Sequence, residues 1–264
     1  MISAIRSQLF DFLEAVGKYI ILVYEVLTAA IKKPPSWSLL REQCYNIGVL
    51  STTVVGITGF TTGFVLAAQS IYQLSEKGLA SVTGILVGKA MITELGPVLT
   101  AFMVTGRVGS SMCAELGSMR VTEQIDALKS MAINPNRYLV APRFLAGIVM
   151  VPLLTIFSMV MGIFGGYLIT VHFFGMASST YFDPMPLHIT TFDMLTGFIK
   201  SLVFGIILVT ICCYKGMHTT GGAAGVGKAT TQSVVTSYVL ILIWDFLLTM
   251  ALNTIHTEFT LDRV

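Results

Sequence analysis

Charged side chains are scarce in this sequence. Asp, Glu, Lys and Arg together make up 11% of its 264 residues, whereas 54% are apolar and the mean hydropathy is +0.80. Soluble domains carry about 25% charged residues, so this chain lacks the charge to cover a water-facing surface of its size. The net charge of +2 is also too small to indicate a nucleic-acid partner. The composition therefore predicts an integral membrane protein.

Cysteine and histidine are rare, and their spacing excludes familiar site patterns. The four histidines are scattered and no nucleophile–base pair stands out, so we predict no metal site and no catalysis on this chain. A cleavable signal peptide is not expected, because the first apolar run is short and follows Asp11 and Glu14. We therefore expect a mature N-terminus. The cysteines, which match no zinc pattern and are predicted to be small buried residues, are Cys44, Cys113, Cys212 and Cys213.

Long apolar runs, by contrast, are abundant. Each membrane span needs roughly 20 apolar residues. The sequence thus predicts an all-α integral membrane protein, with one membrane domain over 1–264 and a five-span region over 45–254. Small residues four apart inside these runs allow helix backbones to approach closely, within one chain or between two. The five predicted spans are 45–72, 81–105, 144–174, 195–214 and 233–254, and the small pairs are Gly59/Gly63, Gly84/Gly88 and Gly162/Gly166.

Residues 4–32 precede the first span and show a different pattern. Apolar side chains fall on one helical face and charged side chains on the opposite face, which predicts an amphipathic helix lying in the membrane surface. A helix packed on the rest of the protein is the alternative. The apolar face holds Leu9, Leu13, Val16, Ile20, Tyr24 and Leu27, and the charged face holds Asp11, Glu14, Lys18 and Glu25.

The loops differ in positive charge. Lys and Arg precede the first span and fill the second–third and fourth–fifth connections, whereas the other two connections hold only Lys77. The positive-inside rule then places the N-terminus in the cytoplasm and the C-terminus outside.

The segment between the second and third spans carries a helical pattern over 114–132. Val121, Ile125 and Leu128 recur at helical spacing, and Asn134-Pro135 ends the pattern. We predict a short amphipathic helix at the cytoplasmic side. One hypothesis is a helix that docks into a soluble partner; the alternative is a re-entrant or surface-resting helix.

Four ionisable residues fall within the predicted spans. Glu94 and Asp245 lie near the middle of theirs, and Lys89 and Lys200 lie nearer the outer side. Intramembrane charges usually face a cavity or a partner, so these residues are candidates for lining a polar cavity or binding a lipid headgroup. The alternatives are buried pairing or snorkelling, with snorkelling favoured for both lysines.

A proline follows one of these residues. Pro97 has no N–H, so the carbonyl of Thr93 loses its helical donor beside Glu94. A kink or a locally polar backbone is expected there, either as a hinge or as an ordinary tolerated proline.

Gly222–Lys228 matches the first seven positions of a phosphate-binding P-loop. The eighth position is Ala229, where the motif needs Ser or Thr, and the segment follows a membrane span instead of a strand. We therefore predict a flexible cytoplasmic connection here and no nucleotide site.

Several motifs in order resemble the MlaE/YrbE family of ABC-transporter permeases. They cover nearly the whole chain. Some family members carry an arginine before the glutamate of the first motif, where this sequence has Thr93. The motifs are Glu94–Thr100, Gly106–Ser110, Ala114–Gln124, Gly225–Thr231 and Asp245–Thr249.

The resemblance implies a homodimeric permease of the inner membrane, with an N-terminal interfacial helix and five spans. It implies coupling to a cytoplasmic ATPase, which would hold ATP and Mg so that this chain needs no cofactor, and to a periplasmic MCE-type lipid-binding protein. The implied cargo is phospholipid or a related lipid, and Glu94 matches a polar position near the lipid pathway. The ATPase-coupling candidates are Glu115, Gly117, Met119, Thr122, Glu123, Gln124, Asp126 and Leu128. The lipid-pathway candidates are Glu94, Pro97, Lys89, Lys200 and Asp245.

Two other function classes remain open from the residues. One is an ion-coupled secondary transporter with Glu94 and Asp245 as relays, although no internal repeat of the kind common in that class is detected. The other is a non-transporting membrane scaffold, in which the intramembrane polar residues would matter little.

Overall fold

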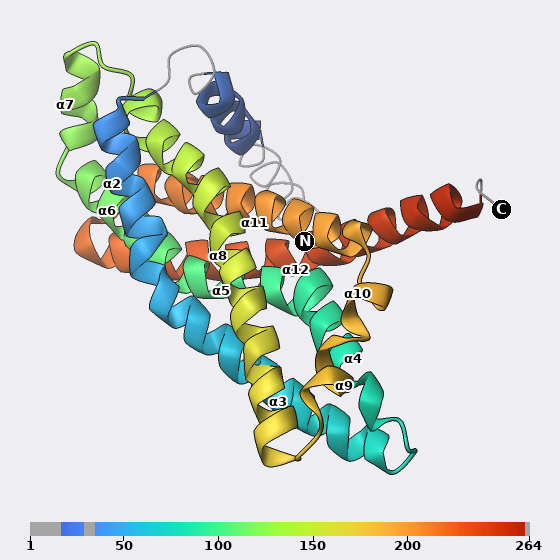
Figure 1. Cartoon of the computed structure of the whole chain (residues 1–264). Helices are drawn as coiled ribbons and strands as arrows, with labels where there is room; N and C mark the ends of the chain where they lie inside the picture. Colours follow the sequence, from blue (N-terminus) through green and yellow to red (C-terminus); the bar gives the residue numbers. More distant parts are fainter. Residues whose placement is uncertain (1–16, 29–34, 262–264) are drawn as a thin grey trace, which may run out of the picture.

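The computed structural model describes residues 17–28 and 35–261, and within these segments the chain forms helices and no strand (Figure 1). The prediction of an all-α integral membrane protein with five spans is confirmed. Each helical stretch is longer than the span predicted for it. The five stretches that are apolar and long enough to cross a membrane are Trp37–Ser75, Ala80–Val121, Asn136–Phe173, Thr191–Met217 and Gly222–Glu258.

Most of these stretches are composite. The first contains α2 (Trp37–Ile47), η1 (Val49–Ser51) and α3 (Thr52–Ser75). The second contains η2 (Ala80–Val82), α4 (Thr83–Ala90), η3 (Met91–Leu95), α5 (Gly96–Val104), η4 (Thr105–Gly109) and α6 (Ser110–Val121). The third contains η5 (Asn136–Val140), α8 (Ala141–Leu168) and η6 (Ile169–Phe173), and the last two are α11 (Thr191–Met217) and α12 (Gly222–Leu261). Short helices α7 (Gln124–Ser130), α9 (Ser178–Phe182) and α10 (Met185–His188) lie in the connections. The segments η3 to η6 are π-helical turns.

Helices α3 and α8 pack with almost no side-chain volume between them. A Cβ on Gly63 would overlap the carbonyl oxygen of Gly162, and a Cβ on Gly59 would lie 2.6 Å from the carbonyl oxygen of Ser158. Only glycine permits such an approach of two backbones. These predicted small-residue pairs therefore act within one chain.

The described part of the predicted N-terminal helix, residues 17–28, is helical, and the rest of that prediction lies outside the described residues. Ile20 and Tyr24 are exposed, whereas Leu22 and Val26 are buried against the bundle. The segment thus has an apolar side that faces outward and a second apolar side that packs on the protein. The segment therefore packs on the rest of the protein, and its position in the membrane surface stays a prediction.

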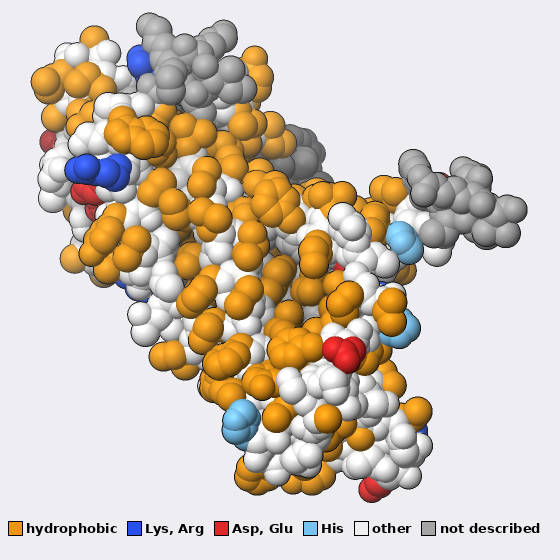
Figure 2. Space-filling view, viewed as in Figure 1, with side chains coloured by type: hydrophobic (Ala, Val, Ile, Leu, Met, Phe, Trp, Pro, Cys, Tyr) orange, Lys and Arg blue, Asp and Glu red, His pale blue; other side chains and the backbone are white. Residues whose placement is uncertain are grey.

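Apolar side chains dominate the face of the bundle seen in Figure 2, and the few charged ones lie towards its ends. The C-terminal part of α12 extends beyond the other helices (Figure 1). Only 11% of the most apolar window of α12 is buried. An apolar helix left so open is expected to contact lipid or another protein chain. Its exposed large apolar side chains are Val235, Val239, Leu242, Ile243, Trp244, Phe246, Leu247, Met250 and Ile255.

Candidate functional site

Three of the ionisable residues predicted within the spans meet inside the bundle. The Lys200 ammonium on α11 donates a hydrogen bond of 2.5 Å to Glu94 Oε2 in η3. The same ammonium forms an ion pair with Asp245 Oδ1 on α12, at 2.9 Å. The geometry of this contact is not that of a hydrogen bond. Thr249, one turn after Asp245, donates to Glu94 Oε1 at 3.3 Å. We call Glu94, Lys200, Asp245 and Thr249 the Lys200 cluster; it joins the second, fourth and fifth spans.

Glu94 lies on a π-helical turn. The N–H of Gly96 donates to the carbonyl oxygen of Met91, five residues back, and Pro97 follows without an N–H of its own. Such single π turns inside α-helices occur frequently at functional sites. The irregular backbone predicted beside Glu94 takes this form.

Gly197 brings α11 close to this turn. A Cβ on Gly197 would overlap the carbonyl oxygen of Ile92 in η3 and lie 2.9 Å from Met159 Cε. Residues three apart share a helix face, so the close approach at Gly197 carries the Lys200 ammonium to η3. Sequence reasoning missed Gly197, although a glycine three residues before an intramembrane lysine was a usable signal.

Burial differs sharply within the Lys200 cluster. The side chain of Lys200 is 0% exposed, that of Asp245 is 20% exposed and that of Glu94 is 39% exposed. The expectation that Lys200 snorkels to the surface is therefore wrong, because two carboxylates inside the bundle compensate its charge. A lone buried ammonium would cost several kcal/mol. One lysine against two carboxylates leaves one negative charge, and Glu94 is the member most open to a ligand.

Lys89 lies apart from this cluster. Its ammonium is 3.5 Å from Asp193 Oδ1, and its side chain is 53% exposed. Asp193 caps α11, because its carboxylate accepts from the N–H and the hydroxyl of Thr190 while the Thr190 hydroxyl accepts from the Asp193 N–H. Sequence reasoning missed Asp193, although Thr followed three residues later by an acidic residue resembles the capping-box pattern.

The helix predicted over 114–132 is two helices in the structure. Helix α6 continues the second span to Val121, and α7 begins at Gln124 after a turn at which Glu123 has a φ of 60°. The prediction of one continuous helix is wrong. The left-handed conformation is usually taken by Gly or Asn, so a glutamate there gave no sequence signal for the break.

Three charges converge across that turn. Arg120 Nη1 on α6 donates to Asp126 on α7 at 2.8 Å, and Lys129 Nζ lies 3.1 Å from Asp126 Oδ1. All three side chains are between 34% and 56% exposed. Hydrogen bonds from Lys129 and then from Arg120 hold the pKa of Asp126 below its ordinary value. We call these three residues the Asp126 cluster.

Arg143 ties α6 to α8. Its Nη2 lies 2.8 Å from Glu115 Oε2, and its Nη1 donates to the carbonyl oxygen of Leu139 at 2.6 Å. The Arg143 side chain is 5% exposed, whereas that of Glu115 is 54% exposed. From the sequence, Arg143 was only one of several positive charges between the second and third spans, so its ion pair with Glu115 was not predicted.

The predicted ATPase-coupling residues differ in their exposure to solvent. Gly117 is buried, and a Cβ there would lie 3.1 Å from the hydroxyl oxygen of Thr219, so Gly117 serves internal packing. Met119 and Leu128 are half-buried against the core. The exposed members, open to a partner, are Glu115, Thr122, Glu123, Gln124 and Asp126.

The chain is similar to known permeases over most of its length. The family model described as Permease MlaE matches residues 40–251. The chain belongs to the MlaE permease family. It is 40% identical to a probable ABC transporter permease of Rickettsia bellii, over 94% of this chain and 95% of that protein. It is 34% identical to the intermembrane phospholipid transport system permease MlaE of Haemophilus influenzae, over 94% of this chain and 95% of that protein.

In this MlaE-family chain, the P-loop-like segment Gly222–Lys228 forms the first turns of α12. The prediction of a flexible connection is wrong there, because one continuous helix runs from this segment into the fifth span. Gly221, just before the helix, and Gly222, its first residue, have φ values of 89° and 65°, so these glycines make the turn into the helix. Among residues 17–28 and 35–261, no three His, Cys, Asp or Glu side chains are grouped as ligands for a metal ion.

Proposed function

We propose that this chain is the membrane-spanning permease subunit of an ABC transporter that moves phospholipids or related lipids between the inner membrane and the outer envelope. The observation that carries the proposal is the similarity, along 94% of the chain, to the phospholipid transport permease of Haemophilus influenzae. The five apolar stretches fit that role. The comparisons lend no support to an ion-coupled secondary transporter or to a scaffold.

The proposal places ATP hydrolysis on a separate cytoplasmic ATPase, which holds ATP and Mg, and leaves this chain without a cofactor. The ATPase docks on the exposed residues of the α6–α7 region. A 42-residue helical stretch is about 63 Å long, whereas the hydrocarbon core is about 30 Å thick. The second stretch therefore extends past the hydrocarbon, and its α6 end can reach a partner in water.

The remaining partners follow the same proposal. A second copy of the chain packs against the exposed apolar face of α12, and an MCE-type lipid-binding protein receives lipid on the periplasmic side. The excess of Lys and Arg at the α6–α7 end supports a cytoplasmic N-terminus and a periplasmic C-terminus.

Within this function, the Lys200 cluster gives the lipid pathway a polar contact. Lipid sites combine a wide apolar lining with a few polar groups that orient the headgroup. Glu94 is 39% exposed and is the most open member of a cluster that has two carboxylates and one lysine, so it suits the cationic part of a zwitterionic headgroup. Because Lys200 links three spans, a shift of one span changes the contacts of the other two.

Replacing Glu94 with alanine tests the proposal. The change removes the hydrogen bond to Lys200 and the exposed carboxylate, and charged hydrogen bonds contribute about 1.5–3 kcal/mol. We expect ATP-dependent transfer of fluorescent phospholipid, measured in vesicles reconstituted with the ATPase and the lipid-binding partner, to fall at least about tenfold. Co-purification of the ATPase should change far less.

Glu76→Ala is the matched control, because Glu76 is an exposed carboxylate in the connection between the first and second spans, away from the Lys200 cluster. It should transfer lipid at the wild-type rate. Wild-type transfer by Glu94→Ala would remove Glu94 from the pathway, and absence of ATP-dependent transfer by the wild-type complex would contradict the proposed function itself.

A further inference from the structure

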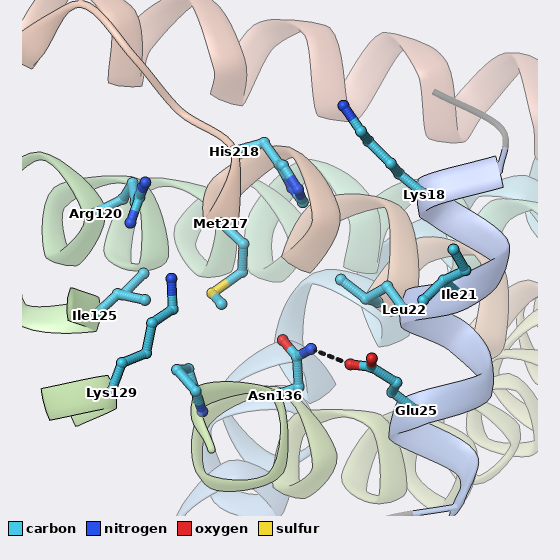
Figure 3. A pocket seen from close by; sticks show the side chains of 11 residues that line it. Lys18, Ile21, Leu22, Glu25, Arg120, Ile125, Lys129, Asn136, Met217 and His218 are labelled. Carbon is cyan, nitrogen blue, oxygen red and sulfur yellow. Dashed lines mark hydrogen bonds between the residues drawn. The ribbon is translucent and has the colours of Figure 1, made fainter. Parts of the chain in front are cut away.

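A groove lies away from the Lys200 cluster, between helical segment 17–28, helices α6 and α7, η5 and the end of α11 (Figure 3). Its volume is about 380 Å³. Five elements of the chain contribute to it, so it depends on the assembled fold. Its lining residues are Lys18, Ile21, Leu22, Glu25, Arg120, Ile125, Lys129, Pro135, Asn136, Met217 and His218.

Positive charge converges on one side of this groove. Figure 3 shows Lys129 extending from α7 towards Met217, with Arg120 above it on α6. Asp126 is the acidic partner of both cations and does not line the groove. Two cations that share one carboxylate leave one positive charge on this side, with N–H groups suited to phosphate oxygens.

The acidic residue of the groove is held on the other side. Asn136 Nδ2 donates to Glu25 Oε2 at 2.7 Å, as the dashed line in Figure 3 shows. This bond fixes the Glu25 carboxylate next to η5. The lining carboxylate of the groove is therefore held apart from Arg120 and Lys129, and an anionic group is favoured at these two cations.

The groove also borders an apolar surface. Ile21 lines it and is 59% exposed, and its neighbours Ile20 and Tyr24 are 59% and 68% exposed. Leu22, which is 5% exposed, forms part of the floor. A helix with this pattern lies at headgroup depth, with apolar side chains in the acyl boundary. A ligand here meets cations at one end and apolar side chains at the other.

We propose that this groove binds one anionic phospholipid from the adjoining leaflet, with its phosphate on Arg120 and Lys129 and an acyl chain along Ile21. Juxtamembrane cations attract anionic lipids. The site lies apart from the Lys200 cluster, and lipid binding here does not depend on the proposed transport function.

Binding at this site has a consequence for the fold. The phosphate and Asp126 compete for the same two cations, so an occupied groove weakens the contact that holds α7 to the end of α6. Removing Asp126 should therefore strengthen lipid binding, whereas removing the two cations should abolish the preference for anionic lipid.

The test uses the full-length protein in nanodiscs that contain phosphatidylcholine and phosphatidylglycerol in equal amounts. Native mass spectrometry of the released protein counts the lipids retained. We expect the wild type to retain phosphatidylglycerol preferentially, and Arg120→Gln/Lys129→Gln to lose at least about fivefold of that preference. Asp126→Asn should raise it. The matched control is Arg41→Gln/Lys228→Gln, which removes two exposed cations outside the groove and should keep the wild-type preference.

Three outcomes would overturn the proposal. The first is a wild type without headgroup preference. The second is an equal loss in the groove variant and in the control, which would indicate general charge attraction. The third is displacement of the retained lipid by inorganic phosphate at equal concentration, which would assign the cations to free phosphate instead of a lipid headgroup. Circular dichroism of each variant checks that the helices are retained.

Discussion

The Lys200 cluster and the Asp126 cluster are built from the same kinds of ion pair in opposite proportions. In the first, one lysine lies between two carboxylates inside the bundle, and the lysine side chain is 0% exposed. In the second, one carboxylate lies between two cations, and Asp126 is 50% exposed. The distances in the two clusters are similar, so the clusters differ in the sign of their excess charge and in burial. Inside the bundle each charge depends on its partners, whereas at the surface water replaces a lost partner.

This contrast predicts where mutation is costly. Breaking a buried pair leaves an uncompensated charge and costs about 3–5 kcal/mol. Exposed pairs exchange their partner for water and salt, so their loss is mild. The Lys200 cluster should therefore control the integrity of the bundle, and the Asp126 cluster should control what the bundle binds.

The largest effect is expected from Lys200→Met. The variant leaves Glu94 and Asp245 close together without the cation that compensates their charges. We expect the thermal midpoint of the detergent-solubilised protein to fall by roughly 10 °C. Lys89→Met is the matched control, because the Lys89 side chain is 53% exposed and its partner Asp193 keeps the hydrogen bonds from Thr190 when the lysine is removed. Equal midpoints for the two variants would remove the distinction drawn between buried and exposed pairs.

An effect of intermediate size is expected on binding of the ATPase, without a loss of membrane insertion. Glu123→Lys/Asp126→Lys reverses two exposed charges at the proposed docking surface. We expect pull-down of the ATPase to fall at least about tenfold, because charge reversal at an interface costs several kcal/mol, while membrane insertion stays intact.

The matched control for that reversal is Glu76→Lys/Asp183→Lys, which changes two exposed carboxylates in the connections opposite α7. It should bind the ATPase as the wild type does. Normal pull-down with Glu123→Lys/Asp126→Lys would contradict the proposal that the ATPase docks on the α6–α7 region.

The sequence predicted the features that follow from hydrophobicity. Five spans were found because a run of about 20 apolar residues has few other uses, and Glu94, Asp245 and Lys200 stood out because charge is rare in such runs. The alternation of charged loops was visible for the same reason. The roles of the coupling and lipid-pathway residues stay predictions.

The features that were missed depend on contacts between distant segments. Lys200 was expected to reach the surface because the sequence did not show its partners. Glu94 and Asp245 lie 106 and 45 residues away from it along the chain. Gly197 matters only because Ile92 of another span faces it. The turn at Glu123 was missed because its left-handed backbone occurs in a residue that rarely adopts it.

The smallest effect is expected from Asp126→Asn, and its sign depends on pH. The pKa of Asp126 is lowered in the folded protein by Lys129 and Arg120, so the ionised carboxylate stabilises the fold at pH values above its unfolded pKa. That contribution is lost as the pH falls through the folded pKa. Thermal midpoints of the wild type and the variant should therefore differ slightly at neutral pH and converge in acid. A gap that widens in acid would show that Asp126 does not gain its stability from these two cations, and that the exposed cluster does not follow the rule drawn from its buried counterpart.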